Sequence, residues 1–195
     1  MIALDWTPPP CHHPVLLPAG RQWDAIRTSL PIATRAFPYL HGAESCATII
    51  DRRAHTAVWL IPPGQATDAP WEQWQRLSPH VAAFPLAPEP TYIAYIGVPP
   101  AARRGGPGIH WRRPNGWAGR YVVADTELLA RALAAAVTSV HGPDALARQC
   151  RVCRQTVPHT HAVTAIGRLN PTDHRPRRLI AHRDCARGMT IEGQP

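Results

Sequence analysis

Four side chains near the end of this 195-residue sequence have the types and spacing of metal ligands. Cys150 and Cys153 are separated by two residues, as are His182 and Cys185, and 28 residues (154–181) lie between the pairs. A gap of two residues allows a tight turn to direct both side chains at one ion, and zinc takes four nitrogen or sulfur ligands in a tetrahedron. Because two such pairs complete the coordination shell, the sequence predicts a structural rather than a catalytic zinc ion.

The same side-chain types allow other arrangements. The two pairs could be unrelated clusters of reduced cysteines. His159 and His161 are rival ligands, although exposed histidines are the commoner outcome. A second metal cluster could in principle form upstream, where a packed or exposed cysteine is the ordinary outcome; its members would be Cys11, His12, His13 and Cys46.

The predicted ligands need a scaffold, and residues 145–195 would supply it. This segment is too short to bury enough apolar surface to fold unaided, which favours a fold that depends on the metal. We predict a knuckle turn at the first pair, a strand of a small hairpin or ribbon at 162–166, and a short helix at 182–189. The result would be a zinc-ribbon or treble-clef-like module.

Arginine is the only strongly basic residue type, and the formal net charge is +8. The absence of lysine is explained most simply by a GC-rich coding sequence, but the positive charge is compatible with a polyanion partner. From residue 145 onward nine arginines face three acidic residues, a surplus of six. Arg175, Arg177 and Arg178 form a cluster predicted to contact nucleic-acid phosphates, and the alternative is a solvated basic surface.

A second basic cluster lies in residues 99–120, which the sequence predicts to be one long loop. An aromatic ring among basic side chains is typical of grooves in which single-stranded bases stack. The alternative is a solvated basic surface with the tryptophan packed in the core. The predicted contacts of this loop are Arg103, Arg104, Trp111, Arg112 and Arg113.

The sequence does not indicate a catalytic site. Its 13 acidic residues are scattered, whereas two-metal nucleotidyl transfer requires carboxylates gathered around the ions. Asp125 and Glu127 are the only alternating acidic pair, and the start of a helix explains them. There is no phosphate-binding loop, nucleophile elbow or dinucleotide fingerprint. The interpretation therefore leans towards a protein that is not an enzyme, with an enzyme left open.

Upstream of the predicted zinc module, hydrophobic periodicity indicates an α+β domain with a two-layer, mostly antiparallel sheet. Residues 1–14 would form an extended proline-rich arm and 15–142 the domain itself. The expected strands are 15–17, 47–50, 57–61, 81–86 and a buried strand at 91–98. The expected helices are 22–40 with an interruption at Pro31, 70–77, and 126–140 with Asp125 as its N-cap.

Four short sequence segments of this domain carry a resemblance to known proteins when they are taken together: 20–25, 59–64, 97–100 and 106–114. They resemble uncharacterised small proteins of high-GC bacteria, a group similar to the N-terminal domain of bifunctional DNA primase/polymerases. That family uses an acidic pair and a histidine around metal ions. No position here matches the acidic pair, so the resemblance implies a catalytically silent copy and assigns no catalytic residue.

Three functions remain after these considerations. The first is a non-enzymatic, zinc-containing accessory protein that binds nucleic acid. The second is a protein-interaction adaptor with purely structural zinc, for which the apolar anchors would be Trp6, Trp71, Trp74 and Trp117. The third is a degenerate primase/polymerase-like enzyme. No apolar run approaches the ~18 residues needed to cross a bilayer, and the first residues lack a signal-peptide pattern. We therefore expect a cytoplasmic protein without a membrane partner.

Overall fold

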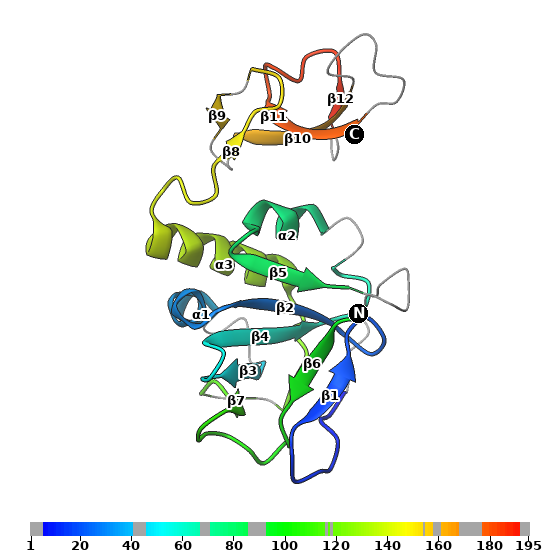
Figure 1. Ribbon diagram of the computed structural model, residues 1–195, viewed down its shortest axis with the longest axis vertical. Helices are drawn as coiled ribbons and strands as arrows, with labels where there is room; N and C mark the ends of the chain where they lie inside the picture. Colours follow the sequence, from blue (N-terminus) through cyan, green and yellow to red (C-terminus); the bar gives the residue numbers. More distant parts are fainter. Residues whose placement is uncertain are drawn as a thin grey trace. The chain divides into compact units, whose positions relative to one another are not determined.

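A computed structural model of the chain describes residues 6–40, 46–66, 71–85, 93–115, 117, 119–153, 155–157, 161–167 and 177–191. The chain divides into two compact units, Met1–Val140 and His141–Pro195 (Figure 1). Both contain short antiparallel strands, and helices are few. Of the helices in the described ranges, none is long and apolar enough to span a bilayer.

The first unit is built on a five-stranded antiparallel sheet, in which β4 lies at the centre (Figure 1). The strands expected at 47–50 and 57–61 are confirmed and form a hairpin, because Ile50 pairs with Ala57 across the turn at 52–55. In spatial order the strands are β5 (Val81–Phe84), β2 (Asp24–Ser29), β4 (Thr56–Ile61), β3 (Thr48–Asp51) and β7 (Ile109–Arg112).

Successive side chains of a strand point to opposite faces of the sheet. The two faces of this sheet pack against different parts of the first unit. On one face Ile49, Val58 and Trp111 lie in register and belong to the main hydrophobic core. A second sheet contributes to that core through β6 (Tyr95–Val98), which pairs with β1 (Val15–Pro18). On the other face Trp59 contacts the ring of Phe37, with ring centroids 5.8 Å apart.

Phe37 belongs to a helical segment, and this segment corrects the prediction of a helix over 22–40. Residues 24–29 form β2 instead, with Ile26 between Trp59 and Ala83 of its neighbours. Helix α1 (Leu30–Ala36) begins only there, with Pro31 in its first turn, where a missing N–H costs nothing. The 3-10 helix η1 (Phe37–Leu40) continues it.

The other two helices follow the prediction closely. Helix α2 covers Trp71–Leu77 and helix α3 covers Thr126–His141. Asp125 caps α3, because its Oδ1 accepts the N–H of Leu128 at 2.8 Å. The buried stripe of α3 includes Leu129, Leu133 and Val137, as its helical spacing requires.

Two predictions for residues 91–120 were wrong in part. The segment 99–120 is not one loop, because it contains strand β7 at the edge of the main sheet. Strand β6 is also less enclosed than expected, since Tyr95 is 59% exposed. Residues 91 and 92 lie outside the described part of the chain.

The second unit consists of small antiparallel sheets around a core of its own. One sheet joins β8 (Arg148–Gln149) to β9 (Thr156–Val157). The other has β10 (Ala162–Gly167) between β11 (Arg177–His182) and β12 (Thr190–Ile191). The predicted strand at 162–166 is thus confirmed, and its partner β11 places His182 opposite Ala162.

Candidate metal centre

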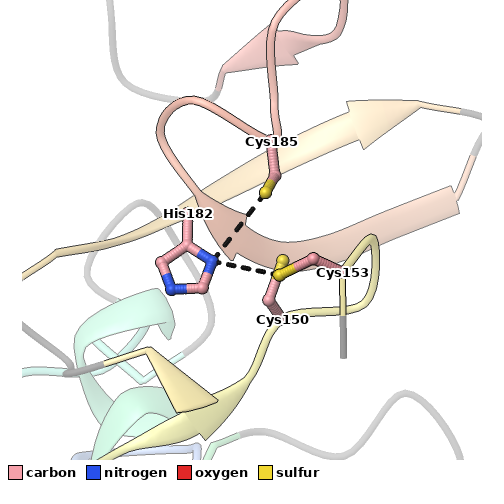
Figure 2. A group of neighbouring side chains, drawn as sticks. All are labelled: Cys150, Cys153, His182 and Cys185. Atoms are coloured by element: carbon pink, nitrogen blue, oxygen red, sulfur yellow. Dashed lines mark hydrogen bonds between the residues drawn. The ribbon is translucent and has the colours of Figure 1, made fainter. Parts of the chain in front are cut away.

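The four predicted ligands meet in the second unit. Figure 2 shows the side chains of Cys150, Cys153, His182 and Cys185 pointing toward one another. One ligand atom from each lies within 4.8 Å of all the others. The Nδ1 atom of His182 is 3.5 Å from the Sγ of Cys153 and 3.8 Å from that of Cys185. Ligands of a tetrahedral metal–thiolate centre are separated by about 3.8 Å when the metal–sulfur bond is about 2.3 Å, so the group is close enough to hold an ion.

The first cysteine pair lies on a turn that the backbone fixes from two sides. The β8–β9 ladder ends directly before it, and the N–H of Cys150 donates to the carbonyl of Gln155 at 2.8 Å. The N–H of Arg151 donates to the carbonyl of Ile180 in β11 at 3.0 Å. This second bond ties the turn to the strand that delivers His182, so both pairs belong to one hydrogen-bonded framework.

The second pair is held by the end of a strand rather than by the predicted helix over 182–189. His182 is the last residue of β11, and turns follow it. The N–H of Ala186 does donate to the His182 carbonyl at 3.0 Å, as in a helix, but no α-helix continues. Gly188 has a positive φ of 83°, which suits a chain reversal rather than helix propagation.

The cysteine pKa values show how poorly this cluster tolerates three negative charges. Burial raises the pKa of the Cys150 thiol, but hydrogen bonds from the backbone N–H groups of Cys153, His182 and Val152 and from the His182 side chain lower it to about 6. Burial raises the pKa of Cys185 to about 11, aided by hydrogen bonding and charge repulsion from Cys150 and Cys153. A bound cation would supply the charge that lets all three sulfurs ionise.

The alternative ligands that the structure describes do not join the cluster. His161 is exposed in the turn before β10, and His159 lies outside the described residues. Upstream, the Sγ of Cys11 donates to the carbonyls of Pro9 and His13. Cys46 is buried with its Sγ near the carbonyl of Ala47. Within the described ranges, Cys150, Cys153, His182 and Cys185 form the one group of three or more such side chains placed to hold an ion.

The residues predicted to contact nucleic acid lie in several different environments. Trp111 was wrong as a base-stacking platform, because it is completely buried and its Nε1 donates to the Pro99 carbonyl. Arg103 donates to the Pro107 carbonyl of its own loop, and Arg113 donates to the Ala101 carbonyl and the Tyr121 hydroxyl. These two arginines therefore stabilise the loop.

The guanidinium groups of Arg104 and Arg112 form no hydrogen bonds with described residues. Arg104 is exposed, and Arg112 lies over the Phe37 ring. Arg175 lies outside the described residues. Arg177 and Arg178 begin β11, opposite Gly167 and Ile166, and their side chains are outside the described part of the structure.

The structure places further basic residues between the ligands of each pair and in the β3–β4 turn. Arg151 lies inside the first ligand turn and Arg183 inside the second, and both are exposed. Their position between the ligands of each pair was the signal that could have found them. Arg52 and His55 lie in the β3–β4 turn, and only the fold brings that turn close to β7.

One expected anchor of the adaptor hypothesis is also placed in the interior. Trp74 is 1% exposed, and its Nε1 donates to the Gln65 carbonyl. Trp6 packs edge-on against Trp23 and Tyr121, and Trp117 packs against Tyr121. These rings stabilise the first unit, and the Trp71 side chain lies outside the described residues.

Comparison of the chain with protein-family models, with curated proteins and with solved structures found no match.

Proposed function

We propose that this protein is a non-enzymatic accessory protein in which a structural zinc ion orders a basic surface for binding nucleic acid. The observation that carries the proposal is the position of Arg151 and Arg183. Each lies between the two ligands of one pair and is exposed. The ion that fixes the two ligand turns would therefore also fix two cationic side chains.

Zinc is the ion that this ligand set favours. Thiolate and imidazole ligands suit zinc, and three sulfurs with one nitrogen form a common structural zinc site. Four protein ligands leave no coordination position for a substrate, which is the basis for a structural role. The short hairpin β10–β11, with one ligand turn beside it and one at its end, supports a ribbon-like module.

The charge of the second unit supports nucleic acid as the partner. Nine arginines follow residue 145, and the acidic residues after it are Asp173, Asp184 and Glu192. Asp184 is paired with Arg187 at 3.0 Å, on the exposed surface. Arg151 and Arg183 are not engaged in such pairs with described residues, so they can bind phosphate oxygens with two N–H groups each.

The test is the salt dependence of binding to a fluorescently labelled single strand and to a duplex. We expect affinity to fall as salt rises, and the Arg151→Ala/Arg183→Ala variant to bind more weakly with a log–log slope reduced by about one to two. The Arg21→Ala/Arg35→Ala variant removes equal charge from exposed positions of the other unit and serves as the control. An affinity that does not change with salt concentration, or an equal loss of affinity in both variants, would contradict the proposal.

A further inference from the structure

The first unit contains a pocket that the metal centre does not explain. Its volume is about 910 Å³, and it lies on the face of the main sheet opposite the Trp111 core. Ile50, His110 and Arg112 contribute from β3 and β7, because they share the face that alternation assigns to them. Helix α1 and η1 contribute Leu30 and Phe37.

The lining of this pocket is basic. Four arginines and two histidines reach it, and the lining contains no acidic residue among those that the structure describes. The nearest carboxylate in sequence belongs to Asp51, whose Oδ1 accepts the N–H groups of Arg53 and Ala54 within the turn. The basic residues are Arg52, His55, Arg104, His110, Arg112 and Arg113.

Arg112 and Arg113, two neighbouring arginines of the lining, differ in their hydrogen bonding. Arg113 donates to the Ala101 carbonyl and to the Tyr121 hydroxyl. The guanidinium of Arg112 forms no hydrogen bond or ion pair with a described residue and lies 3.6 Å from the Phe37 ring centroid. Arg112 is also half-buried, and burial lowers its pKa. An arginine stays protonated in proteins, so an anion beside Arg112 would offset this desolvation.

The segments that carry the basic side chains are fixed by the backbone. The N–H of Trp111 donates to the Arg103 carbonyl at 2.8 Å, which closes the loop beside Arg104. The N–H of Leu30 donates to the His55 carbonyl at 2.7 Å, which joins the β3–β4 turn to the start of α1. The pocket is therefore largely formed before a ligand arrives, as small-molecule sites usually are.

We propose that this pocket binds an organic phosphate, with the phosphate held by Arg104 and Arg112 and the organic portion against Leu30 and Phe37. The guanidinium fork matches phosphate oxygens in a bidentate way. The volume is in the range of small-molecule sites, and the apolar wall offers a surface for a ring. This site belongs to the first unit and does not rest on nucleic-acid binding by the second.

The experiment is calorimetric titration of the full-length, zinc-loaded protein with ADP, inorganic pyrophosphate and adenosine. We expect ADP to bind more tightly than pyrophosphate, and adenosine to bind at least about tenfold more weakly than ADP, because the charged arginines need the phosphate. Failure of ADP to bind would overturn the proposal. Equal affinity for ADP and pyrophosphate would overturn the part assigned to the apolar wall.

Variants locate the binding to the pocket. Arg112→Lys keeps the charge but loses the fork, and Arg104→Ala removes an exposed side chain, so the fold should remain intact. We expect each to weaken ADP binding about tenfold, while the Arg21→Ala/Arg35→Ala variant, altered at exposed positions outside the pocket, binds as the unaltered protein does. Unchanged affinity in both pocket variants would refute the assignment, and a thermal melt of each variant separates lost binding from lost folding.

Discussion

The Sγ atom of Cys153 lies 3.5 Å from the Nδ1 atom of His182, across 29 positions of the sequence. That approach joins the β8–β9 turn to the end of β11, and it places two further cysteine sulfurs within reach of the same point. The second unit has only a small core, of which Val157, Val163 and Ala165 are members. A bound ion would therefore contribute a large part of its folding free energy.

Replacement of Cys150 and Cys153 by serine should abolish metal binding and unfold the second unit. All seven tryptophans precede residue 118, so tryptophan fluorescence reports on the first unit alone. We expect metal content by mass spectrometry to fall to background and amide protection in β10 and β11 to disappear, while the fluorescence-detected melting temperature stays unchanged. Cys11→Ser is the control and should retain the metal; a variant without the pair that still holds its ion would contradict the assignment.

The affinity for zinc should rise with pH. Three of the four proposed ligands are thiolates, so protons would compete with the metal. Cys150, with a pKa of about 6, is already ionised at neutral pH, and its competition appears only as pH falls through that value. Cys185, with a pKa raised to about 11, must release its proton on binding across the neutral range. A competitive chelator titration should show affinity increasing at least about tenfold per pH unit near neutrality; a flat profile would exclude Cys185 as a ligand.

Trp111→Ala should destabilise the first unit by about 3–5 kcal/mol, because the ring is completely buried and its loss leaves a cavity. Denaturant unfolding followed by the remaining tryptophans measures the change. Leu16→Ala is the matched control, since Leu16 is 71% exposed and its truncation should have little effect. A variant with unaltered stability and weaker nucleic-acid binding would restore Trp111 as a stacking platform.

Removal of the helix cap at Asp125 tests the local structure of α3. Asp125→Ala should cost about 1 kcal/mol of unfolding free energy, because the N–H of Leu128 loses its acceptor. Asp125→Asn keeps a hydrogen-bond acceptor and should therefore retain most of the unfolding free energy that Asp125→Ala loses. Glu127→Gln removes the charge of the exposed pair with Arg131 and a weak interaction with the helix dipole, and it should cost less than half as much. Equal effects of all three changes would show that charge, not capping, matters here.

The sequence was sufficient where the determining geometry is local. The two-residue gaps between Cys150 and Cys153 and between His182 and Cys185 describe turns, and the structure places all four side chains together. The cap of Asp125 and the stripe of α3 are likewise set by neighbours along the chain. Which nitrogen of His182 faces the sulfurs could not be predicted, because the side-chain torsion angles in the folded protein decide it.

Long-range pairing explains the wrong predictions for residues 22–29 and 99–120. Ile26 has the helical spacing of its neighbours, yet it pairs with Trp59 and Ala83 in the sheet. The strand β7 was hidden because glycines and arginines surround it, and its partner β3 ends more than 50 positions earlier, at Asp51. The basic pocket depends on that same pairing, so local patterns alone gave no indication of it.

Alternate residues of strand β7 point to opposite faces of the main sheet. Its odd positions, Ile109 and Trp111, pack in or against the core, whereas its even positions, His110 and Arg112, line the pocket. The charge of the pocket could therefore be changed at Arg112, which is half-buried, without altering the residues that pack in the core. A charge change at Arg112 should therefore cost less folding free energy than a change at the buried His110 or Trp111.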